Sequence, residues 1–314
     1  MKKDIVIITG PTASGKTEIS IELAKRINGE IVSADSMQIY KYMDIGSAKP
    51  TLEEMQGIPH YMIDIVDPKE EFSVALYRKM AGECIDNIIK RGKVPIVVGG
   101  TGLYINSLTY PLDFTNTAND KEYRLYLQGL AEEYGGEHIH LMLKEVDIET
   151  ANRLHPNDIK RIIRALEVYK NTGKTMSEYQ KESKNKPIEY NIAYIGLYMD
   201  RQKLYDRINK RVDKMFEKGL IEEVKKLKEM GYNKNMTSMQ GIGYKEVLDY
   251  LDGLYTLDET IDIIKQSTRR YAKRQLTWFR RENRIYWIDL DNFNSLDEIL
   301  ENIIFYIESK INLV

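Results

Sequence analysis

The chain has 314 residues, of which 42% are hydrophobic and 30% are charged, and its formal net charge is −2 at pH 7. No apolar run approaches the roughly 18 residues that a membrane-spanning helix needs, so we expect a globular protein that does not enter a membrane. The single cysteine, Cys84, excludes an intramolecular disulfide framework and a multi-cysteine zinc site, and a cytoplasmic protein is expected. Because the overall charge is near zero, binding of a nucleic acid would need a local basic patch.

The first residues predict a strand, a phosphate-binding loop and a helix. Residues 4–9 (DIVIIT) are a β-branched run typical of a buried strand, and a helix is predicted over 16–28. The segment between them has the spacing G-x-x-x-x-G-K-[ST], in which backbone N–H groups converge on an anion and a lysine adds charge. This pattern predicts a phosphate site for ATP, GTP or a smaller diphosphate, with Mg²⁺ at the final hydroxyl. The loop residues are Gly10, Pro11, Thr12, Ala13, Ser14, Gly15, Lys16 and Thr17.

Asp35 follows a second predicted strand, at 30–33, and so is expected beside the phosphate loop. A carboxylate there could accept a proton or bind the polar edge of a ligand, and the alternative role is that of a cap for the following turn. Further strands are predicted at 60–66 and 94–98, with a helix at 74–90 between them. This order predicts a parallel sheet whose functional edge lies at the strand ends.

The strand at 94–98 is followed by glycines and Thr101 (GGTG). P-loop NTPases usually place a carboxylate after a core strand to organise Mg²⁺ and water. Glycines at a strand end allow close approach of a ligand, and Thr101 either faces that ligand or caps the next helix. The missing carboxylate argues against a hydrolytic motor and for a transferase pocket.

A helical block interrupts the strand pattern. Strand character is absent from 113–187 and returns at 191–199, which predicts a helical insertion domain in a P-loop NTPase-like α/β core formed by 1–112 and 188–314. Within the block, Lys160, Arg161 and Arg164 share one helix, either as a solvated face or as a binding surface. The block's predicted helices cover 121–134, 148–154, 157–170 and 175–181. The later elements are predicted helices at 201–218, 221–230, 244–251, 257–281 and 296–311, and a strand at 284–289.

A basic stripe lies on the predicted helix 257–281. Its members follow helical spacing, with Tyr271, Gln275 and Trp278 beside them, and basic and aromatic side chains of this kind contact phosphates and stack on bases. The alternative is a solvated helix whose aromatic residues belong to the core. The stripe consists of Arg270, Lys273, Arg274, Thr277 and Arg281.

Together these motifs resemble the tRNA dimethylallyltransferase (isopentenylpyrophosphate:tRNA transferase) family. The matching segments occur in order from residue 10 to residue 280, and the later ones are more specific to the family than the phosphate loop. The resemblance is to bacterial-type members, because eukaryotic members carry a zinc finger after this region and the sequence has no Cys or His cluster for one. The segments are GPTASGKT, DSMQIY, DIGSAKP (the family often has GTAKP), GGTGLY, HPNDIKRIIRALE, GIGYKE and YAKRQLTWFR.

The resemblance implies transfer of a dimethylallyl group from dimethylallyl diphosphate to N6 of the adenosine 3′ of the anticodon in tRNA. The loop and Mg²⁺ would then hold the donor diphosphate, with Arg207 or Arg211 as a further ligand. Asp35, Thr101 and Lys16 would be the catalytic residues.

The resemblance also implies a tRNA surface, with the insertion closing as a lid over the anticodon stem-loop. A monomer is the default expectation. The implied tRNA contacts are Asp35, Ser36, Met37, Gln38, Thr101, Arg124, Lys160, Arg161, Ile162, Ile163, Arg164, Gln240, Gly241, Ile242, Gly243, Tyr244, Lys245, Arg270, Lys273, Arg274 and Arg281.

Three alternative functions are open at this level. A small-molecule P-loop kinase would use the loop for ATP, but it would not explain the basic stripe and the insertion. An adenylate isopentenyltransferase would keep the donor but would have little use for the stripe. A non-enzymatic RNA-binding module would leave the complete phosphate loop unexplained.

Overall fold

The computed structural model describes residues 2–110, 120–185 and 188–312. The chain divides into two compact units, a core unit (1–108 with 189–314) and an insertion unit (109–188). The limits predicted for the insertion, 113 and 187, lie outside the described residues. None of the helices in the described ranges has both the length and the hydropathy that crossing a bilayer requires.

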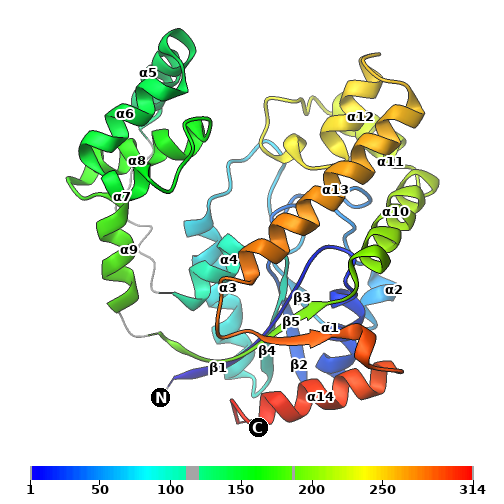
Figure 1. The fold of residues 1–314 in the computed structure, drawn as a ribbon. Coiled ribbons are helices and arrows are strands. Elements are labelled where there is room, and N and C mark those ends of the chain that lie inside the picture. The colour runs from blue at the N-terminus through cyan, green and yellow to red at the C-terminus, as the bar shows by residue number, and fades with distance from the viewer. Residues whose placement is uncertain (1, 111–119, 186–187, 313–314) are drawn as a thin grey trace. The chain divides into compact units, whose positions relative to one another are not determined.

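The core unit is built on one six-stranded sheet with the order β3-β2-β4-β1-β5-β6 (Figure 1). Every pairing in it is parallel, as the strand and helix pattern predicts. The central strand β1 lies between β4 and β5, and the chain between these two neighbours contains the insertion unit. The strands are β1 Lys3–Thr9, β2 Gly29–Ser33, β3 His60–Tyr61, β4 Val94–Gly99, β5 Tyr190–Tyr198 and β6 Tyr286–Asp289.

Helices cover both faces of the sheet, and strand β1 shows why. Its Val6 and Ile8 pack with α1 and α14, whereas Ile5 and Ile7 pack with α3 and α4. All four side chains are fully buried, as expected of a strand inside a doubly covered parallel sheet. The helices of the core unit are α1 Lys16–Arg26, α2 Leu52–Met55, α3 Val74–Lys90, α4 Gly102–Thr109, α10 Arg201–Glu217, α11 Leu220–Glu229, α12 Tyr244–Leu251, α13 Leu257–Phe279 and α14 Leu296–Glu308.

The insertion unit is helical, as predicted. Helices α5, α6 and α8 share a core that includes Leu127, Leu143 and Leu166. Helix α6 has no counterpart among the predicted helices, because it begins after Gly135 without a side-chain cap and so lacks the usual start signal. The helices are α5 Lys121–Tyr134, α6 Gly136–Val146, α7 Ile148–Ala151, α8 Ile159–Thr172 and α9 Met176–Asn185.

The strand predicted over 60–66 is wrong beyond its first two residues. Strand β3 ends at Tyr61, because Met62 (φ 64°) and Asp64 (φ 55°) adopt left-handed backbone conformations that a strand cannot contain. Pairing resumes only as an isolated bridge between Tyr40 and Val66.

The end of β4 packs tightly against the segment that follows β2. A Cβ at Gly99 would overlap the backbone of Ala34, whose N–H donates to the carbonyl of Val98 at 2.7 Å. The N–H of Thr101 donates to the Ala34 carbonyl at 3.1 Å. Only glycine therefore permits this approach of two strand ends.

We expect Gly99→Ala to lower the free energy of unfolding by about 2 kcal/mol, because backbone atoms would have to move to admit the methyl group. Gly82→Ala is the matched control. Gly82 lies inside α3 with nothing within 4 Å of its added Cβ, so this change should raise stability by about 1 kcal/mol. Urea unfolding of both variants measures the two shifts, and equal effects would contradict the packing argument.

Candidate functional site

The phosphate loop connects β1 to α1 and has a backbone that only glycine can supply at two points. Gly10 and Gly15 have φ values of 148° and 91°, and a Cβ at Gly10 would lie 2.6 Å from the carbonyl oxygen of Leu197. Ser14 Oγ is buried and has no hydrogen-bond partner within the described part of the chain. A buried hydroxyl without a partner is a feature that a bound anion would account for.

Lys16 is held inside this loop. Its Nζ donates to the carbonyls of Gly10 at 3.0 Å and Pro11 at 2.7 Å. Burial and, next, the positive charge of Arg211 lower the pKa of Lys16 to about 7, while Asp35 opposes the shift. The ammonium is therefore a charge that an anion in the loop would stabilise.

A cavity of ≈ 770 Å³ opens beside the loop and contains most of the predicted site residues of the core unit. Its walls come from the loop, the segment after β2, helices α10 and α13, and the turn before α12. Predicted residues in its lining are Thr12, Ala13, Ser14, Gly15, Lys16, Thr17, Asp35, Ser36, Met37, Gln38, Arg207, Arg211, Gln240, Gly241, Ile242 and Arg274.

Asp35 serves as a turn cap and also lines the cavity. Its Oδ1 accepts hydrogen bonds from the N–H groups of Met37 at 2.8 Å and Gln38 at 3.4 Å. Among residues that the structure describes, Oδ2 has no hydrogen bond. The two roles weighed from the sequence are therefore compatible, since the turn occupies one carboxylate oxygen and leaves the other.

Thr101 fixes the segment that follows Asp35. Its Oγ1 accepts from the N–H of Ser36 at 3.0 Å and donates to Ser36 Oγ at 3.3 Å. The Tyr271 hydroxyl lies near Thr101 and Gln275, and both lower its pKa slightly. Burial and the Asp35 carboxylate raise the pKa of Tyr271, so its hydroxyl stays protonated and can donate.

Both arginines left open by the sequence reach this cavity from α10. Arg207 Nη2 lies 3.5 Å from the position that a Cβ of Gly15 would occupy, which places Arg207 against the loop. Burial lowers the pKa of Arg211, and the Asp35 carboxylate raises it. The guanidinium groups of Arg207 and Arg211 and the ammonium of Lys16 therefore line one cavity, which favours an anionic ligand with more than one charge.

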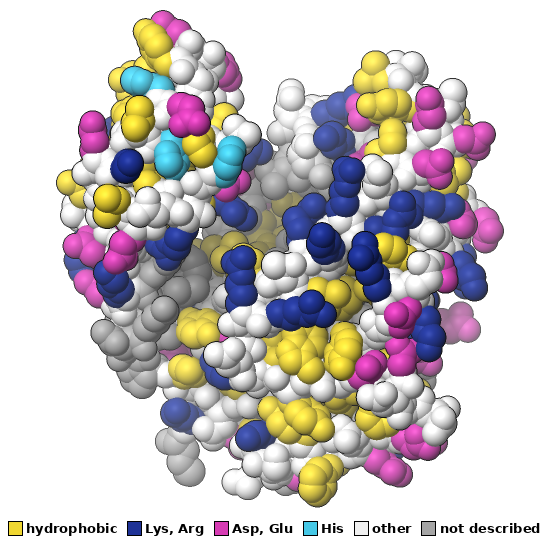
Figure 2. Space-filling view, in the orientation of Figure 1, with side chains coloured by type: hydrophobic (Ala, Val, Ile, Leu, Met, Phe, Trp, Pro, Cys, Tyr) yellow, Lys and Arg dark blue, Asp and Glu magenta, His cyan; other side chains and the backbone are white. Residues whose placement is uncertain are grey.

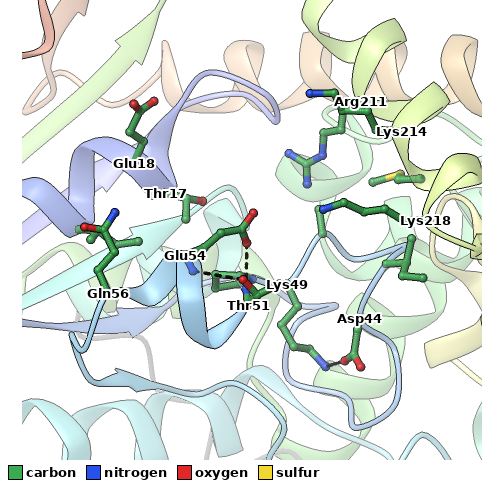
Figure 3. A pocket seen from close by; sticks show the side chains of 15 residues that line it. Thr17, Glu18, Asp44, Lys49, Thr51, Glu54, Gln56, Arg211, Lys214 and Lys218 are labelled. Carbon is green, nitrogen blue, oxygen red and sulfur yellow. Dashed lines mark hydrogen bonds and ion pairs between the residues drawn. The ribbon is translucent and has the colours of Figure 1, made fainter.

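A second cavity of ≈ 480 Å³ adjoins the first, because Thr17 and Arg211 line both. Figure 3 shows Arg211 and Lys214 of α10, and Lys218 in the turn after it, among the residues that line this cavity, together with Glu18 and Glu54. Both cavities next to Thr17 are therefore lined by cationic side chains, and the second contains carboxylates as well.

The sequence analysis placed Gln275 beside the basic stripe but gave it no role, and the structure shows it 5% exposed on the inner face of α13. Its Oε1 accepts from the N–H of Thr12 at 2.8 Å, and its Nε2 donates to the carbonyl of Gly100 at 2.9 Å. A Cβ at Gly100 would overlap Gln275, and one at Gly102 would overlap Trp278. The glycines after β4 therefore admit side chains of α13, and the prediction that they admit a ligand is wrong for Gly102; Gly100 does line the cavity.

The basic stripe on α13 is exposed. Arg270, Lys273, Arg274 and Thr277 point to solvent, and Arg281 is exposed in the turn after the helix, which ends two residues earlier than predicted. Figure 2 shows Lys and Arg side chains gathered over the face along which α13 runs in Figure 1.

Parts of the predicted RNA surface before and within α12 are structural. Tyr244 is fully buried, accepts from the Ser47 N–H at 3.1 Å and donates to Glu223 Oε1 at 2.8 Å, so a tRNA contact by its side chain is wrong. Gly243 is also buried, whereas Lys245 is exposed. Glu223, which the sequence analysis missed, accepts from the N–H groups of residues 44, 45 and 46 and holds the loop that lines the cavity.

In the insertion unit, too, some of the predicted RNA contacts are exposed and others are buried. Lys160 and Arg161 are exposed. Ile162 and Ile163 are 0% and 7% exposed and pack in the core of this unit, so contacts between their side chains and RNA are wrong.

Arg124 and Arg164 share one buried partner in the insertion unit. Arg124 donates to Glu167 through Nε at 2.8 Å and Nη2 at 2.9 Å, and Arg164 donates to the same carboxylate. Glu167 is fully buried. The carboxylate fixes the position of both guanidinium groups, and their contact with RNA stays a prediction.

The protein oxygens beside the loop could hold a metal ion only together with a bound ligand that supplies further oxygen atoms. In the described ranges, no three His, Cys, Asp or Glu side chains come together as a metal site. The Thr17 hydroxyl and the Asp35 carboxylate do line the same cavity. Mg²⁺ commonly takes one or two protein oxygens and completes its shell with water and substrate phosphates, so this set suits Mg²⁺ held together with a diphosphate.

Comparisons with known proteins agree on one family. The family model described as IPP transferase matches residues 38–282, and the one described as isopentenyl transferase matches residues 3–67. The tRNA dimethylallyltransferase of Acetivibrio thermocellus is 57% identical over 304 residues, which cover 97% of each chain.

Solved structures give the same result. The tRNA isopentenylpyrophosphate transferase of Bacillus halodurans is 47% identical with a TM-score of 0.72, covering 98% of both chains. The Staphylococcus epidermidis enzyme is 46% identical with a TM-score of 0.73, covering 98% of this chain and 100% of that one. A eukaryotic dimethylallyltransferase acting on tRNA is 31% identical with a TM-score of 0.80, covering 98% of this chain and 80% of that one.

The pKa of Lys16 predicts how anion binding depends on pH. A bound anion stabilises the ammonium, so binding above pH 7 takes up a proton, and the affinity for pyrophosphate should fall by up to roughly tenfold per pH unit. Below pH 7 this dependence disappears, because Lys16 is already charged. Calorimetry of pyrophosphate binding from pH 6 to 9 measures the slope. Lys16→Met controls for titration of the ligand. An equal slope in that variant would show that Lys16 does not contribute to pyrophosphate binding.

Proposed function

This chain belongs to the IPP transferase family, and we propose that it transfers a dimethylallyl group from dimethylallyl diphosphate to N6 of adenosine 37, 3′ of the anticodon, in tRNA. The product is N6-dimethylallyladenosine. The observation that supports this most directly is the ≈ 770 Å³ cavity, in which the phosphate loop, Asp35 and the inner face of α13 meet. We also expect the protein to act in the cytoplasm as a monomer.

The loop side of the cavity suits the leaving group. As the C1–O bond of the donor breaks, the diphosphate departs with the bonding electron pair and gains negative charge. The loop amides, Lys16 and the guanidinium groups of Arg207 and Arg211 line the same space and would stabilise that charge. Mg²⁺ bound at Thr17 would add Lewis-acid neutralisation.

The Asp35 side of the cavity suits the acceptor. The exocyclic amine of adenine is a weak nucleophile, because its lone pair is delocalised into the ring. Asp35 would orient this amine and take its proton as the N6–C1 bond forms. The turn that Asp35 caps and the hydroxyl of Thr101 keep the carboxylate in place.

The exposed surface suits RNA. The target base must leave its stack to reach Asp35, at a cost of a few kcal/mol, and phosphate contacts along the exposed stripe of α13 would offset that cost. Lys160 and Arg161, both exposed, would add contacts from the insertion unit, which we propose acts as the lid over the anticodon stem-loop.

One assay separates this function from its alternatives. The protein is incubated with Mg²⁺ and either labelled dimethylallyl diphosphate or labelled ATP, together with either tRNA or AMP. We expect label from dimethylallyl diphosphate to enter tRNA at adenosine 37. Label from ATP would indicate a kinase, labelled AMP would indicate a free-nucleotide transferase, and RNA binding without transfer would indicate a binding module.

Asp35→Asn tests the proposed base. Asparagine keeps Oδ1 for the N–H of Met37 but removes the charge, so turnover should fall roughly 10²-fold while tRNA affinity changes little. Asp35→Ala also removes the cap of the turn. The difference in turnover between the two variants therefore measures the effect of losing the cap. Turnover near the wild-type rate in Asp35→Asn would exclude the carboxylate as the base.

Salt dependence tests the stripe. Plotting log affinity for the anticodon stem-loop against log salt should give a steep negative slope, and Lys273→Met should make it shallower by about 1. Lys90→Met, at an exposed position on α3, is the control and should leave the slope unchanged. An affinity of the wild type that does not change with salt would count against the stripe as the RNA-binding surface.

A further inference from the structure

We propose that Gln275 is a positioning residue that couples RNA binding on α13 to diphosphate binding in the phosphate loop. The inference deepens the proposed function and rests on it, since it takes the α13 stripe as the RNA surface and the loop as the donor site. It predicts that the diphosphate binds more tightly when RNA is already bound.

The first observation is that Gln275 bridges two walls of the site. One end of its amide accepts from the N–H of Thr12, and the other donates to the carbonyl of Gly100. Thr12 belongs to the phosphate loop, and Gly100 precedes Thr101, which is bonded to the segment after Asp35. A single side chain therefore sets the spacing between the donor side and the acceptor side.

The second observation is the closeness of the packing around this amide. Gln275 is 5% exposed, and the space beside it is available only because residue 100 has no Cβ. Trp278, one helical turn further along, occupies the equivalent space beside Gly102. Side chains of α13 thus contact the turn after β4 at two successive points, so a shift of the helix must either move that turn or reorient both side chains.

The third observation is that the two faces of α13 have different partners. Lys273 and Arg274 are exposed on the stripe, and the next residue in the chain is Gln275, directed at the loop. Arg274 also lines the cavity. RNA phosphates bound to the stripe would restrain the same helical turn that holds the N–H of Thr12.

The energetic consequence is reciprocal. Restraining α13 restrains the loop backbone, so that less conformational freedom is lost when the diphosphate binds, and the diphosphate must favour RNA binding by the same factor. Without the bridge the two sites would bind independently.

The test measures pyrophosphate affinity by calorimetry, with Mg²⁺, in the absence and presence of a saturating anticodon stem-loop. Pyrophosphate carries no group to transfer, so no reaction interferes. We expect a ratio of affinities on the order of 10 in the wild type, within the usual range of coupling between sites. In Gln275→Met, which keeps the volume and loses both hydrogen bonds, the ratio should fall to about 1.

The matched control is Gln266→Met, the same change at an exposed position of α13, and it should keep the wild-type ratio. RNA affinity in the absence of pyrophosphate, and its salt dependence, should be the same in all three proteins, which a general loss of structure would not allow. An unchanged ratio in Gln275→Met, or a ratio of 1 in the wild type, would overturn the proposal.

A second pair of variants tests the contact even if Gln275→Met is unstable. Gly100→Ala should displace Gln275 and abolish the coupling, and adding Gln275→Ala should relieve the overlap and restore stability without restoring the coupling. Full coupling in Gly100→Ala would overturn the proposal. Failure of the inference is distinguishable from failure of the function, because a wild-type enzyme that labels tRNA but shows no coupling rejects only the inference.

Discussion

The site depends on keeping several positive charges close together beside the phosphate loop. Lys16, Arg207 and Arg211 line one cavity. Burial lowers the pKa values of Lys16 and Arg211, and the charge of Arg211 lowers that of Lys16 further. The Asp35 carboxylate compensates only in part. Such an arrangement is costly to fold and is best relieved by a polyvalent anion, which is the chemistry of the proposed diphosphate ligand.

The architecture that holds this cluster could be predicted well from the sequence, because its signals are local. The parallel core, the helical insertion and the ends of helices such as α3 follow from hydrophobic periodicity and caps that lie within each element. The prediction failed where local signals are weak or misleading. The apolar residues after Tyr61 resemble a strand, but the backbone at Met62 and Asp64 turns to the left-handed region. Helix α6 begins at a glycine without a capping side chain.

The site was predictable to the extent that its residues are adjacent in the chain. The phosphate loop and Asp35 could be found from spacing and from their place after strands. Gln275 and Glu223 could not, because their role depends on contacts across 263 and up to 179 positions of sequence. Motif matching also cannot separate a side chain that faces a ligand from its buried neighbour: Ile162 and Tyr244 belong to matching segments, and both are fully buried.

The placement of β1 has a consequence for the order in which the site is completed during synthesis. Its neighbours β4 and β5 come from either side of the insertion, with Lys3 paired to Tyr190, and the N–H of Thr12 waits for residue 275. A nascent chain still attached to the ribosome therefore carries the whole glycine-rich motif long before its support exists. The pairing of β1 with β5 and the hydrogen bond of Thr12 can form only after residues 190 and 275 have been synthesised, so a truncated translation product would carry the motif without these supports.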